Sequence, residues 1–212
     1  MRIADKGRKS RASRVREGVS GSWGTSSQDF VYLAKLLYGH SAKYAKRFDG
    51  NCSAYTPVGI PILLSALRCL LIELNADIYH TGRANQDVLE ELAKSANDIE
   101  VIFKHYSIPT ELHDRLELLV QVRHEILHPA HRPSGDVRNT PAYLAPLRRA
   151  KLLQSTGVKN DYIWLDQLRS HRLFSWGFNT VKQTVAILLE KHQLPRSEAV
   201  KLIASYSGKR RK

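Results

Sequence analysis

Leucine and isoleucine recur at helical spacing through residues 61–79, and this run is the strongest structural signal in the chain. Its apolar residues cover most of the surface of the helix that their spacing predicts: Leu63, Leu64, Leu67, Leu70, Leu71, Leu74 and Ile78. A helix that is apolar on most of its sides has to be buried by its neighbours. Because no segment alternates apolar and polar residues as a strand would, those neighbours are expected to be helices as well. The sequence therefore predicts a helical bundle built around residues 61–79.

Other apolar stripes predict the remaining helices, and prolines mark several of their ends. Pro109 and Pro129 bracket a helix over residues 110–127, because the residue before a proline is disfavoured in the α conformation. The other predicted helices span residues 26–48, 85–106, 143–155, 161–168, 170–194 and 197–208. A chain of 212 residues is long enough for one domain with a substantial core. We predict a single all-α domain over residues 26–208.

The apolar run is shorter than a membrane-spanning helix and carries charge. Residues 60–74 fall short of the roughly 20 residues that a membrane crossing needs, and they include Arg68 and Glu73. Two interpretations of these charged side chains stay open: they are buried residues of a site, or, as we favour, they lie at a dimer surface or reach solvent along their apolar stems. The only cysteines, Cys52 and Cys69, form no CxxC pair, and no apolar stretch follows the basic N-terminus as in a secretory signal. We therefore expect a cytoplasmic protein without a membrane partner.

Positive charge is concentrated at the two ends of the chain. The formal net charge is +13, and residues 1–17 contain seven basic and two acidic side chains. Residues 1–25 have few apolar side chains and are predicted to form a disordered basic arm, and residues 209–212 form a basic tail. Basic tails bind nucleic acid by releasing counterions, and the alternative is that they only increase solubility. The residues of the arm expected to contact nucleic acid are Arg8, Lys9, Arg11, Arg14 and Arg16.

The candidate for chemistry is the segment RHEILHP at residues 123–129, which has two interpretations. In the first, His124 and His128 form an HExxH zinc site, whose intervening glutamate would deprotonate a metal-bound water. Pro129 opposes this interpretation because it ends the helix directly after the second histidine. His131 and Ser134 also stand where the extended zinc pattern has glycine and histidine, which leaves His131 as an irregular third ligand. A zinc hydrolase is therefore the third hypothesis.

In the second interpretation, Arg123 and His128 are the functional pair, and His124 is the polar residue after the arginine. The segment then resembles the motif of the HEPN family, which is an arginine, four to six residues and a histidine, often with Asn, Asp or His after the arginine. The order of helices around it is similar as well, over about residues 27–194. The resemblance implies an HEPN-like helical bundle that cleaves RNA without a metal or cofactor.

The same resemblance assigns roles to these residues and implies partners. It implies that His128 transfers protons and that Arg123 stabilises the phosphate, with His124 orienting one of them. These roles suit the residue types, since an imidazole exchanges protons near neutral pH and a guanidinium binds phosphoryl oxygens. The resemblance further implies a homodimer with a composite site, an RNA substrate, and a role in antiviral defence or as a toxin opposed by an antitoxin protein.

Two observations keep other functions open. Residues i and i+5 of a helix point about 140° apart, so Arg123 and His128 converge only if the helix unwinds at His128. Both residues also suit a purely structural role, because basic side chains near a helix C-terminus interact favourably with its dipole and carbonyls. The second hypothesis is therefore a catalytically inactive HEPN-like module that binds RNA, a nucleotide or a protein.

Overall fold

Helices make up most of the described part of the chain. The computed structural model describes residues 26–47, 51–80, 82–95, 98–128, 141–154 and 164–194. Within these ranges there is no strand, only an isolated β-bridge between Cys52 and Ser170, so the predicted all-α class is confirmed. The basic arm at residues 1–25, the helix predicted over 197–208 and the basic tail lie outside the described residues.

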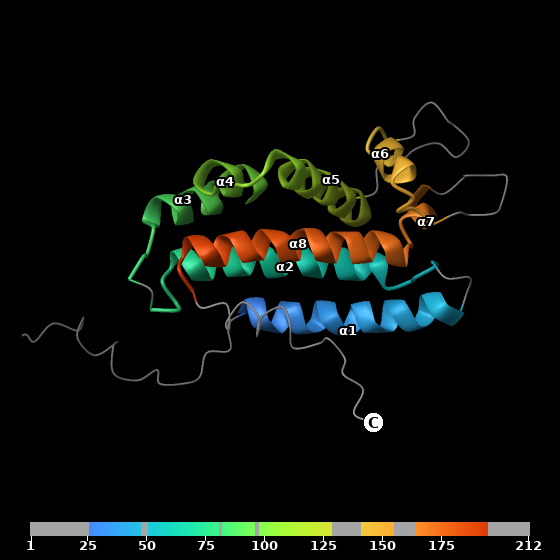
Figure 1. The fold of residues 1–212 in the computed structure, drawn as a ribbon, viewed down its shortest axis with the longest axis horizontal. Helices are drawn as coiled ribbons and strands as arrows, with labels where there is room; N and C mark the ends of the chain where they lie inside the picture. The colour runs from blue at the N-terminus through green and yellow to red at the C-terminus, as the bar shows by residue number, and fades with distance from the viewer. Residues whose placement is uncertain are drawn as a thin grey trace, which may run out of the picture.

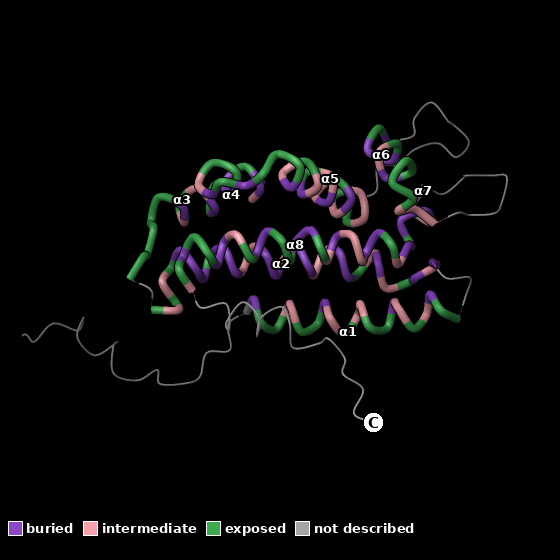
Figure 2. The backbone as a smooth tube through the Cα atoms, in the orientation of Figure 1, coloured by how far each residue is buried: buried purple, intermediate pink, exposed green. Residues whose placement is uncertain are grey.

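Three long helices form the centre of the bundle. Helices α1 (Ser26–Arg47), α2 (Thr56–Asn75) and α8 (His171–Lys191) run lengthwise along the molecule, and α2 packs against both of the others (Figure 1). The buried faces of α2 and α8 turn inward, whereas the outer side of α1 is exposed (Figure 2). Leu71 and Phe174 are among the largest fully buried side chains. Because each buried leucine or phenylalanine contributes about 1.5–3 kcal/mol, this core accounts for much of the stability.

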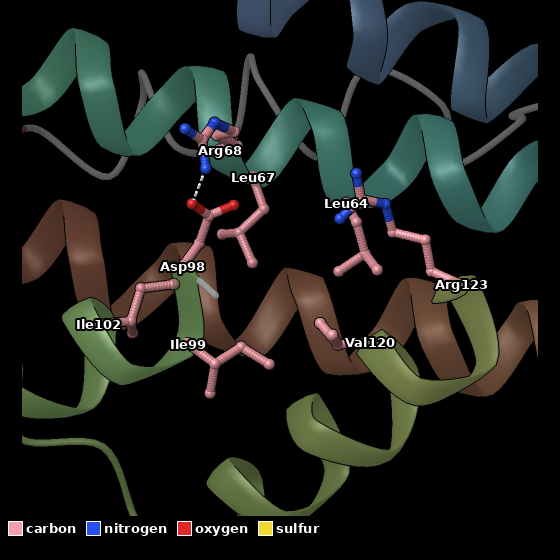
Figure 3. Close-up of a pocket in the computed structure, with 8 residues that line it drawn as sticks. All are labelled: Leu64, Leu67, Arg68, Asp98, Ile99, Ile102, Val120 and Arg123. Atoms are coloured by element: carbon pink, nitrogen blue, oxygen red, sulfur yellow. Dashed lines mark hydrogen bonds and ion pairs between the residues drawn. The ribbon is translucent and has the colours of Figure 1, made fainter. Parts of the chain in front are cut away.

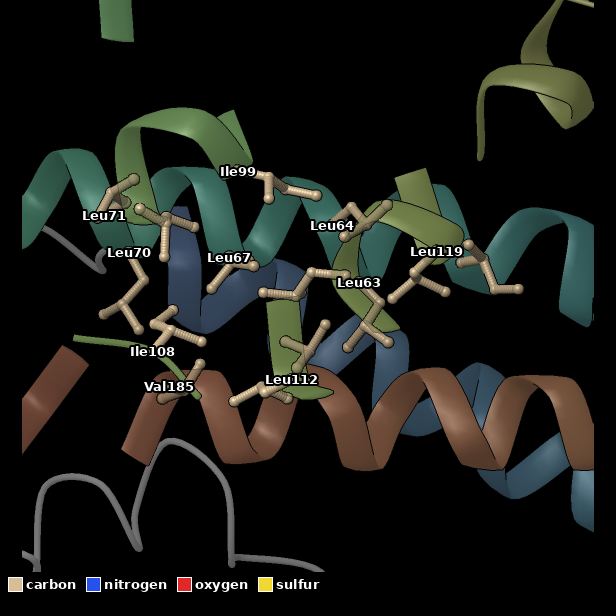
Figure 4. Packing of buried hydrophobic residues seen from close by; sticks show 14 of the residues in the cluster. Leu63, Leu64, Leu67, Leu70, Leu71, Ile99, Ile108, Leu112, Leu119 and Val185 are labelled. Carbon is tan, nitrogen blue, oxygen red and sulfur yellow. The ribbon is translucent and has the colours of Figure 1, made fainter. Parts of the chain in front are cut away.

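A second layer of helices covers α2 and α8. It consists of α3 (Gln86–Lys94), α4 (Asp98–His105) and α5 (Thr110–Leu127), which continue one another along the bundle (Figure 1). Leu112 and Leu119 of α5 pack among the leucines of α2 (Figure 4). The short helices α6 (Leu144–Arg149) and α7 (Trp164–Gln167) lie at the end of the molecule where α5 ends and α8 begins. This end carries the candidate site.

Three predicted helices differ clearly from those in the structure. The helix predicted over 143–155 is only the short α6, which ends at Arg149. The helix predicted over 85–106 is two helices, because α3 ends at Lys94 and Ser95 has an extended backbone. The helix predicted over 61–79 begins earlier, at Thr56, with Pro57 in its first turn and Pro61 inside it. It also ends earlier, at Asn75, because Asp77 takes a left-handed backbone conformation with φ of 56°.

Glu73 lies inside the bundle, and the expectation that it lies on a surface is wrong. Its side chain is buried, and its carboxylate accepts hydrogen bonds from the backbone amide and hydroxyl of Ser27 and from the hydroxyl of Tyr79, at 3.0 Å. The first amides of a helix have no partner within the helix and favour a negative charge. Glu73 supplies this charge from α2 and so fixes the first turn of α1 against the last turns of α2.

The apolar composition of α2 also satisfies the criterion for a membrane-spanning helix. Among the described residues, α2 is the one helix long and apolar enough to cross a membrane. A buried core helix passes the same test, and α2 is surrounded by α1, α3, α5 and α8. In this fold the composition of α2 is explained by its central position.

A buried chain of polar groups predicts a pH dependence of stability. Asn75 donates to the Tyr106 hydroxyl at 2.8 Å, and that hydroxyl lies 2.8 Å from Nε2 of His192. Burial, and then the charges of Arg83 and Lys191, lower the pKa of His192 below its ordinary 6.5. The folded state therefore binds a proton at His192 less readily than the unfolded state does. Neutral His192 makes its full contribution to the free energy of unfolding above pH 6.5, and this contribution is lost as the pH falls from 6.5 toward the lower pKa of the folded state.

We expect the melting temperature to fall between about pH 7 and about pH 5.5, measured by circular dichroism. In His192→Gln the fall should be shallower, with a residual slope from His171, whose pKa is also lowered by burial. Identical slopes in the two proteins would contradict the assignment to His192.

Candidate active site

The two histidines of the RHEILHP segment lie together at the exposed end of α5. The helix ends at Leu127, and His128 caps it: the His128 backbone amide donates to the carbonyl of His124 at 2.8 Å, but its φ and ψ of −131° and 65° are not helical. This ending agrees with the effect of the following proline. The His124 and His128 rings are 5.3 Å apart between centroids, and both residues are exposed. The structure therefore presents two accessible imidazoles side by side.

Arg123 faces a different environment. It is half-buried and points from α5 toward α2, where it lines a small cavity with Arg68 of α2 and Asp98 of α4 (Figure 3). Its Nε atom is buried and has no hydrogen-bond partner among the described residues. The cavity has a volume of about 20 Å³, which is room for one water molecule and not for a phosphate group. In the single chain, Arg123 and His128 are thus not brought into contact.

An ion pair on the wall of this cavity sets its electrostatics. Arg68 is paired with Asp98 and also donates to the carbonyl of Leu92 at 3.0 Å. Burial raises the pKa of Asp98, while the charges of Arg68 and Arg123 act in the opposite direction. One carboxylate therefore faces two guanidinium groups, and the cavity keeps an excess of positive charge. The Arg68 side chain remains 37% exposed in this pair, so it also reaches solvent, and the expectation of a dimer surface stays a prediction.

The other predicted site residues are placed as follows. The arm residues Arg8, Lys9, Arg11, Arg14 and Arg16 lie outside the described residues. Asp98 was not singled out by the sequence, because it is one acidic residue at the start of a helix and belongs to no motif. In the sequence, Arg68 alone could have pointed to this ion pair, because an arginine in an apolar helix needs a charged partner or a route to solvent.

The described residues give the zinc hypothesis no third ligand. Within the part of the chain that the structure describes, no three His, Cys, Asp or Glu side chains form a group able to hold a metal ion. His131, the irregular third ligand suggested by the sequence, lies outside the described residues. A pair of imidazoles alone falls short of the three protein ligands of catalytic zinc sites.

Comparisons with known proteins leave the family unassigned. No family model, no curated protein and no solved structure matches this chain. Any function must therefore be argued from the residues themselves.

Proposed function

We propose that the protein is a metal-independent endoribonuclease of the HEPN type. The observation that carries the proposal is the pair of exposed imidazoles, His124 and His128, at the end of a helix that carries Arg123 directly before its last turn. Imidazoles transfer protons near neutral pH, and a guanidinium stabilises charge on phosphoryl oxygens. A net charge of +13 further favours a polyanionic substrate.

The proposed reaction uses the RNA's own 2′-hydroxyl as nucleophile. One imidazole accepts the 2′-hydroxyl proton as the oxygen attacks the adjacent phosphorus, and a protonated imidazole donates a proton to the departing 5′-oxygen. The products are a 2′,3′-cyclic phosphate and a free 5′-hydroxyl, so no water, metal or cofactor is consumed. His128 is assigned to proton transfer, Arg123 to the phosphate and His124 to orientation.

A second copy of the chain is part of this proposal. Within one chain Arg123 faces the cavity and His128 faces solvent. A homodimer that joins the ends of two α5 helices would supply two His128 side chains to one phosphate. Leu127, 47% exposed beside His128, offers apolar surface for such a contact. The roles in toxin–antitoxin or antiviral systems, with an antitoxin as partner, rest on the family resemblance alone.

The second candidate is an HEPN-like module that binds RNA, a nucleotide or a protein without cleaving RNA. The direction of the Arg123 side chain favours it, because a guanidinium in a cavity that holds one water is not positioned to contact a phosphate. In this candidate Arg123 and Asp98 stabilise the packing of α2, α4 and α5.

Incubation with RNA in the presence of EDTA distinguishes these functions. The nuclease is expected to cleave RNA under chelation and to leave 2′,3′-cyclic phosphate ends, detected by mass spectrometry. Arg123→Ala should lower the rate about 100- to 1000-fold, the range expected for loss of one charge-stabilising donor. Binding without cleavage would support the inactive module, and activity that EDTA abolishes would support the zinc hydrolase.

A further inference from the structure

An open groove lies where the chain leaves α6 and meets the first turns of α8. Its volume is about 500 Å³, within the range of roughly 300–1,000 Å³ for small-ligand pockets. One wall is the segment from Ala150 to Leu152, and the other is the first three turns of α8. The polar and aromatic residues that line it are Lys151, His171, Arg172, Ser175, Trp176 and Asn179.

The charged groups of this groove are all basic. Lys151 and Arg172 line it and are exposed, and no carboxylate lines it among the residues that the structure describes. Arg149, exposed in the last turn of α6, adds positive charge near Lys151. Binding of an anion depends on these side chains, because the first amides of α8 are already bonded: that of Arg172 to the Asn51 side chain at 3.0 Å and that of Leu173 to the Ser170 hydroxyl at 3.2 Å.

An aromatic ring lies beside these cations. Trp176 is half-buried and lines the groove one turn after Arg172, with the exposed amide of Asn179 next to it. The α8 wall of the groove is held in place by hydrogen bonds to α1, between the hydroxyls of Ser175 and Tyr38 at 3.2 Å and between Nδ1 of His171 and the hydroxyl of Ser41 at 2.9 Å. Proteins that bind single-stranded nucleic acid combine basic side chains that follow the backbone with aromatic rings on which bases stack.

We propose that this groove binds a single-stranded segment of RNA, with a base stacked on Trp176 and adjacent phosphates held by Lys151 and Arg172. The choice of RNA as the ligand rests on the proposed function. The groove and the residues that line it are features of the structure and do not depend on that function. The groove lies at the same end of the molecule as the C-terminal end of α5, which carries His124 and His128 (Figure 1). A strand held here would therefore approach the imidazole pair.

Binding is best measured in a protein that cannot cleave the probe. The probe is a fluorescently labelled ten-nucleotide single-stranded RNA, and the protein is the full chain carrying His128→Ala, read by fluorescence anisotropy. Adding Trp176→Ala should weaken binding about 5- to 150-fold, the loss expected for one stacked base, while Trp176→Phe should largely restore it. Adding Arg172→Glu should weaken binding at least tenfold and reduce the slope of log affinity against log salt by about one or more.

Lys182→Glu is the matched control, because Lys182 is an exposed cation on the same helix that does not line the groove. It changes the net charge as Arg172→Glu does and should have a much smaller effect. Equal losses from Arg172→Glu and Lys182→Glu would overturn the proposal, as would competition by free uridine monophosphate at the affinity of the strand. Tight binding by a wild-type protein that leaves RNA intact would refute the nuclease and retain the groove, whereas cleavage and binding unaffected by Arg172→Glu would refute the groove and retain the nuclease.

Discussion

Replacing His128 with alanine is expected to lower the rate of RNA cleavage at least about 100-fold, the usual contribution of a proton-transferring side chain. The protein should nevertheless remain folded. His128 lies at the exposed end of α5 and takes part in no buried contact among the described residues, so the free energy of unfolding should change by less than about 0.5 kcal/mol. The two quantities are measured separately, by initial cleavage rates on a labelled RNA and by urea unfolding.

His40→Ala is the matched control for this substitution. His40 is also an exposed histidine, but it lies on α1 and contacts the ring of Tyr55 rather than the imidazole pair. Its removal should leave the cleavage rate unchanged, and His124→Ala should give an intermediate loss if His124 orients its neighbour. Equal cleavage rates in His128→Ala and His40→Ala would exclude the proposed chemistry.

The second large effect is expected on stability, from Gly59→Ala in α2. A Cβ atom added at Gly59 would lie 2.2 Å from Cζ of Phe174, far inside van der Waals contact. Phe174 is fully buried and packs edge-on against Tyr38, so its ring cannot move aside without disturbing α1 as well. Overpacking of this kind typically costs about 1–3 kcal/mol, and we expect a loss near the upper end of that range in urea unfolding.

Gly39→Ala makes the same chemical change but is expected to raise the free energy of unfolding rather than lower it. Gly39 is an exposed residue of α1, and a Cβ atom there would have nothing within 4 Å. Because glycine is about 1 kcal/mol less favourable than alanine inside a helix, this variant should be slightly more stable than the wild type. Combining Gly59→Ala with Phe174→Leu should recover part of the lost stability. Equal stability of Gly59→Ala and Gly39→Ala would contradict the inference that Phe174 leaves no room for a Cβ atom at position 59.

Local signals predicted some helices to the residue and others poorly. The bounds of α5, Thr110 to Leu127, are those predicted, because prolines at 109 and 129 determine both ends without help from the rest of the fold. The break between α3 and α4 had no such marker, since apolar residues continue at helical spacing across it. Asp98, the first residue of α4, pairs with Arg68 thirty residues earlier, and the local spacing of apolar residues cannot predict a contact of this kind.

In the candidate site, too, local signals predicted some features, while others depend on long-range packing. The end of α5 at His128 followed from the proline, and the angle of about 140° between positions i and i+5 already indicated separate directions for Arg123 and His128. Unwinding at His128 leaves its ring beside His124 and does not bring it to Arg123. The groove beside Trp176 could not be predicted, because Lys151 and Arg172 are twenty-one residues apart and form one surface only after α6 and α8 have packed.

Because Glu73 fixes the first turn of α1, the point where residues 1–25 join the bundle is fixed too. Figure 1 shows α1 beginning toward one side of the long axis and α5 ending toward the other. With 22 residues at 1.5 Å per residue, α1 alone is about 33 Å long. A nucleic acid touched by both the arginines of the arm and the imidazole pair must therefore reach from the first turn of α1 to the end of α5. Substrate length would then determine whether the arm takes part in binding at all.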